Sequence, residues 1–380
     1  KIVINTCAVT NQAVRKSINE IKQASKKYPN HKIYVTGCAS QIEEKSFSNL
    51  NNVVKVIDNS KKTQPESYLE EKSISNNPPF NFPYSENFSS NRSRAMLQIQ
   101  QGCDHRCTFC IIPYGRGDSK SLPFSEISKR AENIINKGYG EIVLTGVDLT
   151  SYGHDLSGKP TLGNILKRLL FDHPKLKRLR LSSIDPAEID DDLLKILSTE
   201  ERVLPHLHLS LQSGDNLILK RMKRRHNREQ VIDLCNKLKL LRPNFTFGAD
   251  VIVGFPTETK EHFEKTLELI RVCNFSNVHV FPFSPKKGTP ASKMPQVKND
   301  IKKKRAEILR HEAERILSKK LDNLIGRTTN ILFECNKKSY TDEFFKVKLT
   351  NQNNIYKKSG SILNVKLISR QGDSLVAELK

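Results

Sequence analysis

The stretch "CDHRCTFC", from Cys103 to Cys110, carries three cysteines at a C-x3-C-x2-C spacing. It follows the strand-like run "AMLQIQ" at 95–100 and precedes a glycine-containing loop. Sulfur ligands this close together favour zinc, copper(I) or an iron–sulfur cluster. A structural zinc needs four ligands, and His105, wedged between two cysteines, would be an awkward fourth. A 4Fe–4S cluster can be held by three thiolates, which leaves one iron open.

The chain around this loop reads as an alternation of strands and helices. Strand-like runs lie at 95–100, 141–146, 178–183, 206–212, 246–254 and 277–283. Helical stretches separate them at about 123–137, 162–171, 187–198, 215–240 and 259–273. A complete eight-fold barrel typically needs ~250 residues, so this alternation predicts a partial, open (βα)6 barrel. Functional residues of such a fold lie at the C-terminal ends of its strands.

The flanking segments predict two further domains in an α/β protein. "KIVIN", "KIYVTG" and "VVKVID", with a helix at about 11–27, indicate an N-terminal βαβ domain with a parallel sheet. After a charged helix at about 298–323, short strands indicate a small β-barrel. We therefore expect an N-terminal domain at 1–75, a Ser/Asn/Pro-rich linker at 76–92, a core at 93–317 and a β-module at 318–380. The chain opens inside a strand without Met, so we expect residues upstream of Lys1.

Composition and charge limit the classes of molecule that this protein is expected to bind. The 380 residues include 63 Lys and Arg against 41 Asp and Glu, a net charge of +22. This excess favours a polyanion, nucleic acid before a membrane surface. No apolar run approaches the ~18 residues of a membrane span. Eight cysteines are too few for a disulfide scaffold, which favours metal or redox use in a reducing compartment.

Cys7 and Cys38 each follow a predicted strand of the N-terminal domain, "KIVIN" and "KIYVTG". The C-terminal ends of neighbouring parallel strands meet at one edge of a sheet, so we expect the two thiols at that edge. Isolated cysteines are usually inert small hydrophobic residues. From the residues alone, a metal site and two inert thiols both remain open.

The motifs together resemble those of the radical S-adenosylmethionine (SAM) methylthiotransferases. They extend from the first residues to about Met294, and they are "NTCAVT", "VTGCASQ", "QGCDHRCTFCIIPYGRG", "GVDLTSYG", "RLSSIDP", "LQSGD" and "FPFSPKKGTPA". The terminal β-module resembles the RNA-binding, OB-like TRAM domain of such enzymes. The resemblance implies that Cys103, Cys107 and Cys110 are catalytic and hold a 4Fe–4S cluster whose open iron binds SAM.

Further cofactor contacts follow from the resemblance. The implied SAM-binding residues are Phe109, Gly146, Ser182, Ser210, Gln212, Arg224 and Gly254. For two of them a role without SAM contact also remains open. Gly254 can be part of an ordinary βα turn, and Arg224 can be part of a solvated basic face. His206 and His208 share a strand face with Ser210 by alternation, and we expect them to be satisfied interior polar groups.

The resemblance also implies a second 4Fe–4S cluster held by three N-terminal cysteines. Cys7 and Cys38 match the second and third of these, and the first is expected upstream of this chain. The three remaining cysteines match no ligand and are expected to be structural: Cys235, Cys273 and Cys335.

"NTCAVTNQA" and "FPFSPKKGTPA" resemble the branch of the family that acts on N6-threonylcarbamoyladenosine at position 37 of tRNA. The implied activity is a transferase reaction: one SAM methylates a sulfur of the auxiliary cluster, a second is cleaved reductively, and the methylthio group enters C2 of the adenine. The alternatives are isopentenyladenosine-37 tRNA, a ribosomal-protein aspartate, or a metal-containing RNA-binding protein without catalysis.

The expected partners follow from this activity. We expect a cytoplasmic monomer that is reduced by a donor such as flavodoxin or ferredoxin and that binds the anticodon loop. Phosphate neutralisation supplies much of the affinity for RNA. The basic residues expected to contact tRNA phosphates are Lys302, Lys303, Lys304, Arg305, Lys319, Lys320 and Arg327.

Overall fold

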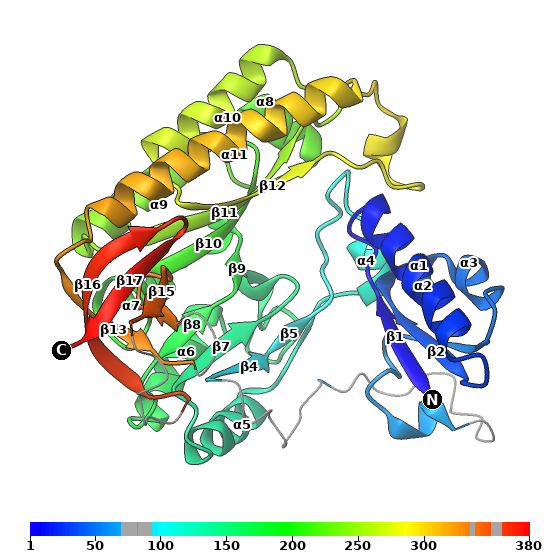
Figure 1. Cartoon of the computed structure of the whole chain (residues 1–380), viewed down its shortest axis with the longest axis horizontal. Coiled ribbons are helices and arrows are strands. Elements are labelled where there is room, and N and C mark those ends of the chain that lie inside the picture. The colour runs from blue at the N-terminus through cyan, green and yellow to red at the C-terminus, as the bar shows by residue number, and fades with distance from the viewer. Residues whose placement is uncertain (70–81, 83–92, 335–338, 351–358) are drawn as a thin grey trace. The chain divides into compact units, whose positions relative to one another are not determined.

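The computed structural model describes residues 1–69, 82, 93–334, 339–350 and 359–380. Except for Phe82, the linker expected at 76–92 lies outside the described residues. The chain divides into two compact units (Figure 1). The first unit comprises Lys1–Pro83, Gln101–Ser119 and Ser284–Met294, and the second comprises Tyr84–Gln100, Lys120–Phe283 and Pro295–Lys380. All five cysteines expected to bind iron therefore belong to the first unit.

The first unit is built on a parallel sheet of three strands in the order β1-β2-β3. The strands are β1 (Ile2–Thr6), β2 (Ile33–Gly37) and β3 (Val53–Ile57). The helices around it are α1 (Asn11–Lys27), α2 (Cys38–Ile42), α3 (Glu44–Ser48) and the 3-10 turn η1 (Pro65–Tyr68). Thr10 caps α1 by accepting a hydrogen bond from the Ala13 amide. The predicted N-terminal βαβ sheet is confirmed.

The cysteine loop is part of this same unit. The short strands β5 (Gln100–Gln101) and β6 (Lys120–Ser121) flank it in sequence, and α4 (Ile112–Arg116) follows the third cysteine. Ile111 packs in one apolar cluster with Ile33, Cys38 and Phe47 of the N-terminal sheet and its helices. The 3-10 turn η4 (Pro290–Lys293) completes the unit. Burial of Ile111 therefore ties the segment after the cysteines to the N-terminal core.

The second unit contains two parallel sheets, in the orders β4-β7-β8 and β12-β11-β10-β9. The strands are β4 (Arg94–Gln98), β7 (Glu141–Thr145), β8 (Leu179–Leu181), β9 (Ser183–Ile184), β10 (His206–Gln212), β11 (Thr246–Val253) and β12 (Asn277–Pro282). The run expected at 178–183 is interrupted at Ser182, which separates β8 from β9. The α/β class with parallel sheets is confirmed.

Helices connect these strands as the alternation predicted, with one exception. They are α5 (Phe124–Asn136), η2 (Leu149–Ser151), α6 (Leu162–Asp172), η3 (Pro186–Glu188), α7 (Asp191–Thr199), α8 (Asn216–Met222), α9 (Arg228–Leu241) and α10 (Lys260–Val272). The single helix expected at about 215–240 is wrong. Lys223 adopts a left-handed conformation (φ 62°) that ends α8, and Asn227 begins α9 with a capping box to Gln230.

The C-terminal part consists of a long helix and a small closed barrel. The helix is α11 (Asn299–Asp322), and the barrel order is β13-β14-β15-β17-β16. The strands are β13 (Thr328–Leu332), β14 (Ser339–Thr341), β15 (Lys346–Leu349), β16 (Ile362–Gln371) and β17 (Ser374–Leu379). Phe333, Val347 and Val365 fill its core together with Leu321 of the helix. The predicted small barrel is confirmed, and no described helix is long and apolar enough to cross a membrane.

Candidate active site

The three-cysteine loop folds back on itself at Gly102. This residue has φ +73°, and a Cβ there would lie 1.9 Å from the carbonyl oxygen of Asp118. The Cys103 amide donates to the Gly117 carbonyl at 3.1 Å, and the Cys110 amide donates to the Cys107 carbonyl at 3.1 Å. Cys107 is buried, whereas Cys103 and Cys110 are half-buried. The loop therefore holds two partly accessible thiols and one buried thiol on a constrained backbone.

Polar side chains and a neighbouring segment fix the loop further. Arg106 donates to the Cys103 carbonyl at 2.5 Å and to Asp118 Oδ1 at 2.7 Å. Asp104 Oδ1 accepts from the Ser119 amide at 2.9 Å, and the Thr108 carbonyl accepts from the Ala291 amide at 2.9 Å. Ligands on so constrained a loop lose little freedom when they bind a metal centre. Three cysteines that form no disulfide with one another fit a 4Fe–4S cluster bound through three irons.

Cys7 and Cys38 follow the ends of two paired strands. Thr6 and Gly37 are register partners at the ends of β1 and β2, and each cysteine is the next residue after its strand. Gly37 has φ +104°, and a Cβ there would lie 2.3 Å from the Thr6 carbonyl oxygen, so only glycine allows this approach. Cys7 is exposed and Cys38 is buried at the start of α2. The structure thus brings both cysteines to one edge of the sheet.

Cationic and amide groups surround these two thiols. Arg116 donates from Nε to the Cys38 sulfur at 3.0 Å, and Asn59 Nδ2 lies 3.9 Å from the same sulfur. Burial lowers the pKa of Lys286, while Glu43 and Cys7 act to raise it, which places Lys286 near Cys7. Positive charge here can balance the negative charge of thiolates that hold a cluster. Asn59, Arg116 and Lys286 were not predicted as site residues, although Arg116 and Lys286 lie within the motifs "QGCDHRCTFCIIPYGRG" and "FPFSPKKGTPA".

In the second unit, the residues expected to bind SAM cluster at the C-terminal ends of parallel strands. Gly146 follows β7 and Gly254 follows β11, whereas Ser210 and Gln212 close β10. Phe109 belongs to the first unit. Ser182 lies between β8 and β9, and its buried hydroxyl has no hydrogen-bond partner within the part of the chain that the structure describes.

A bulge changes the alternation along β10. The register with β11 shifts between Leu209 and Gln212, and Gln212 has φ +66°. His206 bonds Thr246 Oγ1 at 2.8 Å and His208 bonds Asp250 Oδ1 at 3.0 Å, so both are satisfied interior groups as expected. The bulge re-aims the end of the strand, where Ser210 and Gln212 lie.

Arg224 lies in a buried ion pair, so its reading as a solvated basic face is wrong. It donates to Asp185 Oδ2 at 2.8 Å and to the Ser210 carbonyl at 2.7 Å, and its side chain is only 8% exposed. Burial alone would raise the pKa of Asp185, but the nearby His226 and Arg224 hold it well below its ordinary value. Arg224 therefore fixes the bulged end of β10 to the loop before η3.

The turn after β11 is equally constrained. The Gly254 amide donates to Glu258 Oε1 at 3.0 Å, and that carboxylate accepts from Arg305 at 2.7 Å. A Cβ at Gly254 would lie 2.4 Å from Lys302 Cγ. Lys302 and Arg305 are buried, so their expected role as phosphate contacts is wrong: they support this turn.

Lys320 is half-buried, and its ammonium donates to the Asn274 carbonyl at 2.7 Å. Lys303, Lys304, Lys319 and Arg327 are exposed. Five of the seven basic residues are therefore accessible to a polyanion, these four fully and Lys320 in part.

Two of the three remaining cysteines form a buried pair. The hydrogen bond with Cys273 and burial together raise the pKa of the Cys235 thiol. A buried thiol in this state is a poor nucleophile and ligand. The same hydrogen bond lowers the pKa of Cys273, but both side chains are fully buried, which fits the structural role expected for both. Cys335 lies outside the described residues.

Sequence profiles match both units. A profile of the radical SAM superfamily matches residues 97–270, and a profile described as "Uncharacterized protein family UPF0004" matches residues 1–58. The first match includes the three-cysteine loop and the parallel strands from β7 to β11. The second includes Cys7 and Cys38.

Curated relatives match over most of the chain. The threonylcarbamoyladenosine tRNA methylthiotransferase MtaB of Rickettsia prowazekii is 45% identical over 371 residues, 96% of this chain and 87% of that protein. The enzyme of the same name from Bacillus subtilis is 36% identical over 318 residues, 81% of this chain and 70% of that protein. The tRNA-2-methylthio-N(6)-dimethylallyladenosine synthase of Orientia tsutsugamushi is 32% identical over 414 residues, 100% of this chain and 90% of that protein.

Solved structures share the fold at low identity. The radical SAM methyltransferase TsrM from Kitasatospora setae, with cobalamin and a [4Fe-4S] cluster bound, superposes with a TM-score of 0.58 at 11% identity, over 77% of this chain and 62% of that one. The cobalamin-dependent radical SAM enzyme OxsB superposes with a TM-score of 0.51 at 12% identity, over 83% of this chain and 48% of that one. At these identities the likeness establishes the radical SAM fold.

Proposed function

The chain belongs to the radical SAM family of tRNA methylthiotransferases, and on that premise we propose that it inserts a methylthio group at C2 of N6-threonylcarbamoyladenosine at position 37 of tRNA. The observation that carries this substrate is the 45% identity, over 96% of the chain, to a relative named for threonylcarbamoyladenosine tRNA. The relative named for dimethylallyladenosine matches at 32%. The net charge of +22 agrees with an RNA substrate.

The first unit supplies the iron ligands in this proposal. Cys103, Cys107 and Cys110 hold the SAM-binding 4Fe–4S cluster, and Cys7 and Cys38 hold part of an auxiliary 4Fe–4S cluster. When bound, the first cluster supplies the electron that cleaves SAM, and the second supplies sulfur chemistry. The chain's own residues position these centres. The Gly102 turn fixes the loop, and Arg116 places a cation against the Cys38 sulfur.

The second unit supplies the proposed SAM contacts at the ends of its parallel strands. Support comes from the buried hydroxyl of Ser182, which has no hydrogen-bond partner among the described residues and can accept or donate one bond to a ligand. Gly146 allows close backbone approach, because a Cβ there would lie 2.8 Å from Gln100 Oε1. Arg224 acts through its ion pair with Asp185. The remaining members of the proposed set are Ser210, Gln212 and Gly254 of this unit and Phe109 of the first unit.

The finer architecture and partners are part of the same proposal. We assign a methylthiotransferase N-terminal domain to 1–75, a linker to 76–92, a partial (βα)6 radical SAM core to 93–317 and an OB-like TRAM module to 318–380. We propose that this module helps to bind tRNA at the anticodon loop. The reaction requires an electron donor such as flavodoxin or ferredoxin in the cytoplasm, and the enzyme is proposed to act as a monomer.

Mass spectrometry of tRNA nucleosides tests the substrate. A strain that lacks the gene is expected to lose the 2-methylthio derivative of threonylcarbamoyladenosine and to keep threonylcarbamoyladenosine itself. The full-length gene should restore it, whereas a Cys107→Ser copy should not. Loss of the 2-methylthio derivative of isopentenyladenosine instead would move the enzyme to the other tRNA branch.

A second measurement separates an enzyme from a metal-containing RNA-binding protein. Anaerobic reconstitution with iron and sulfide should give iron–sulfur absorbance and 5′-deoxyadenosine from SAM.

Intact tRNA modification in the deletion strain, together with loss of a ribosomal-protein aspartate modification, would contradict the tRNA proposal.

A further inference from the structure

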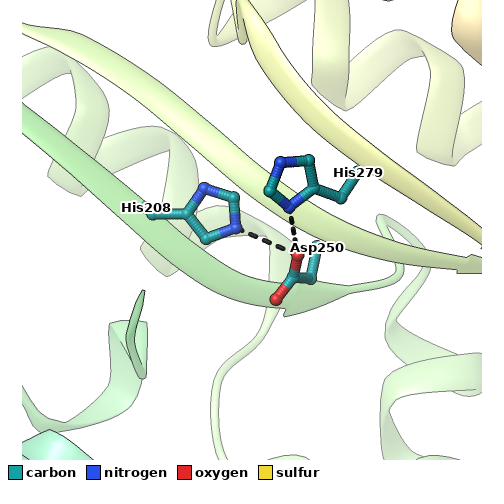
Figure 2. A group of neighbouring side chains, drawn as sticks. All are labelled: His208, Asp250 and His279. Carbon is teal, nitrogen blue, oxygen red and sulfur yellow. Dashed lines mark hydrogen bonds and ion pairs between the residues drawn. The ribbon is translucent and has the colours of Figure 1, made fainter. Parts of the chain in front are cut away.

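Three neighbouring strands of the second unit bring two histidines and one aspartate together. In the register of β10, β11 and β12, His208 pairs with Gly248 and Asp250 pairs with His279. His208 Nε2 lies 3.0 Å from Asp250 Oδ1, and His279 Nδ1 lies 3.0 Å from the same oxygen. Figure 2 shows both imidazoles pointing at this carboxylate. One donor atom from each side chain lies within 4.8 Å of the other two.

The strand between the histidines makes room for this arrangement. A Cβ at Gly248 would lie 2.6 Å from His208 Nδ1, so a side chain at that position would displace the ring. Asp250, two residues further along β11, is the only carboxylate in the run "TFGADVIVG". Its Oδ1 atom lies 3.0 Å from a ring nitrogen of each histidine, so one carboxylate oxygen faces both imidazoles.

The group opens onto a cavity. A space of about 480 Å³ is lined by His208, Asp250 and His279 and also by Asn277 and Ser182. The space is large enough for water molecules or a small ligand. An ion bound here would therefore have coordination positions that water or a ligand can occupy.

Other charges on the cavity wall already have partners. Arg180 pairs with Glu141 at 2.9 Å, and Lys346 pairs with Asp373 at 2.5 Å. These acidic partners offset the cations, so the wall presents little uncompensated positive charge to an ion. Arg94, which also lines the cavity, lies 3.3 Å from a Glu334 oxygen.

We propose that His208, Asp250 and His279 form a binding site for one divalent first-row transition ion, Zn²⁺ or Fe²⁺, separate from the iron–sulfur ligands. Two imidazoles and one carboxylate on one face are the donor set that such ions prefer, and they leave coordination positions open. Ligand atoms ~2.1 Å from an ion lie ~3.0 Å apart at the right angle of an octahedral site and ~3.4 Å apart at the tetrahedral angle of zinc. Both His–Asp separations are 3.0 Å, so they equal the octahedral spacing and are within ~0.4 Å of the tetrahedral one.

The test uses cluster-reconstituted full-length protein, so that the cluster cysteines are occupied, with Zn²⁺ as the probe. After gel filtration, the protein is expected to retain one zinc per chain. Zinc K-edge X-ray absorption should show nitrogen and oxygen ligands at ~2.0–2.1 Å without a sulfur shell at ~2.3 Å. No retained zinc, or a sulfur shell alone, overturns the proposal and leaves a hydrogen-bonded triad.

Variants locate the ion. His279→Gln and Asp250→Asn are each expected to weaken zinc binding at least tenfold, because two protein ligands remain. The His279 side chain is 64% exposed, so its replacement poses little risk to folding. His311→Gln, at an exposed position of α11, removes one imidazole elsewhere and should leave zinc binding unchanged. Equal zinc affinity in His279→Gln and wild type also overturns the proposal, provided that both unfold at the same temperature.

Discussion

Arg116 donates a hydrogen bond from Nε to the sulfur of Cys38 at 3.0 Å. The arginine ends α4, six residues after the third cysteine of the C-x3-C-x2-C loop, and the cysteine begins α2 beside the N-terminal sheet. One side chain thus connects the segment that follows the first set of cysteines with a cysteine of the second set. Gly115 shares in this contact, because a Cβ there would lie 3.1 Å from Cys38 Cβ.

We expect Arg116→Gln to lower methylthio transfer about 10- to 100-fold, the usual range for a residue that supports a metal ligand. Cleavage of SAM without tRNA should change little, because the first set of cysteines is intact. Arg15→Gln, an exposed arginine on α1, is the matched control for charge. Equal losses of SAM cleavage and methylthio transfer would contradict an auxiliary role for Arg116.

Variants of the two sets of cysteines should affect SAM cleavage and methylthio insertion differently. Cys107→Ser replaces a soft thiolate with a hydroxyl and is expected to abolish 5′-deoxyadenosine formation. Cys38→Ser should keep that activity and lose methylthio insertion. Iron content and both products are measured on anaerobically reconstituted protein, and Cys235→Ala, a cysteine of the second unit that belongs to neither set, serves as the control. Full methylthio insertion by Cys38→Ser would exclude it as a cluster ligand.

Gly102 should be more sensitive to substitution than Gly117, although both have φ near +74°. Alanine at a positive φ of this kind is strained at either position, at a cost on the order of 1–3 kcal/mol. At Gly102 the new methyl group would also lie 1.9 Å from a backbone oxygen, whereas at Gly117 no atom lies within 4 Å. Gly102→Ala is therefore expected to retain clearly less cluster iron than Gly117→Ala. Equal iron retention in the two variants would show that the collision is relieved.

Local spacing and hydrophobic alternation were enough to predict much of this molecule. The three-cysteine loop, the parallel strands and the final barrel were visible because each depends on a few adjacent residues. The break in the helix expected at 215–240 was not visible, because "KRRHN" contains neither Gly nor Pro. It depends on a left-handed Lys223 and on the cap from Asn227.

Contacts that depend on helix packing and on strand register could not be predicted from the sequence either. Lys302 and Arg305 were expected to contact tRNA phosphates, yet their helix packs against the turn after β11 and buries them. His208, Asp250 and His279 come together through the pairing of three strands. A lone carboxylate in the apolar run around Asp250 was the only local signal of that group.

The buried pair of Asp185 and Arg224 predicts a stability that depends on pH. Asp185→Asn leaves a buried guanidinium without its charged partner and is expected to cost about 3 kcal/mol of unfolding free energy near pH 7. Because the pKa of Asp185 is depressed in the folded state, the stabilisation is present above the unfolded value of ~3.9 and is lost as pH falls through the folded value.

The difference between wild type and Asp185→Asn should therefore be constant from pH 7 to about pH 5 and shrink below about pH 4. Denaturant unfolding across this range measures it. Asp172→Asn breaks the more exposed pair with Arg168 and should cost less than about 1 kcal/mol. A difference that grew on acidification would contradict the depressed pKa of Asp185.

Binding of tRNA should depend on the exposed lysines of α11 and not on the buried ones. Lys303 and Lys304 are exposed, whereas Lys302 between them and Gly254 is buried. Each phosphate contact contributes ~0.9 to the slope of log affinity against log salt. The double variant Lys303→Gln/Lys304→Gln is therefore expected to bind tRNA more weakly and to reduce the slope by about 1 to 2.

The matched control for that variant is Lys26→Gln/Lys27→Gln, which removes the same charge from exposed positions at the end of α1. Phosphate contacts fix register without reading base identity, so the loss at α11 should be similar for different tRNAs. If both double variants lowered affinity and slope equally, the effect would reflect net charge alone, and α11 would have no special part in binding tRNA. A larger loss at Lys303 and Lys304 would place the phosphate backbone along this helix.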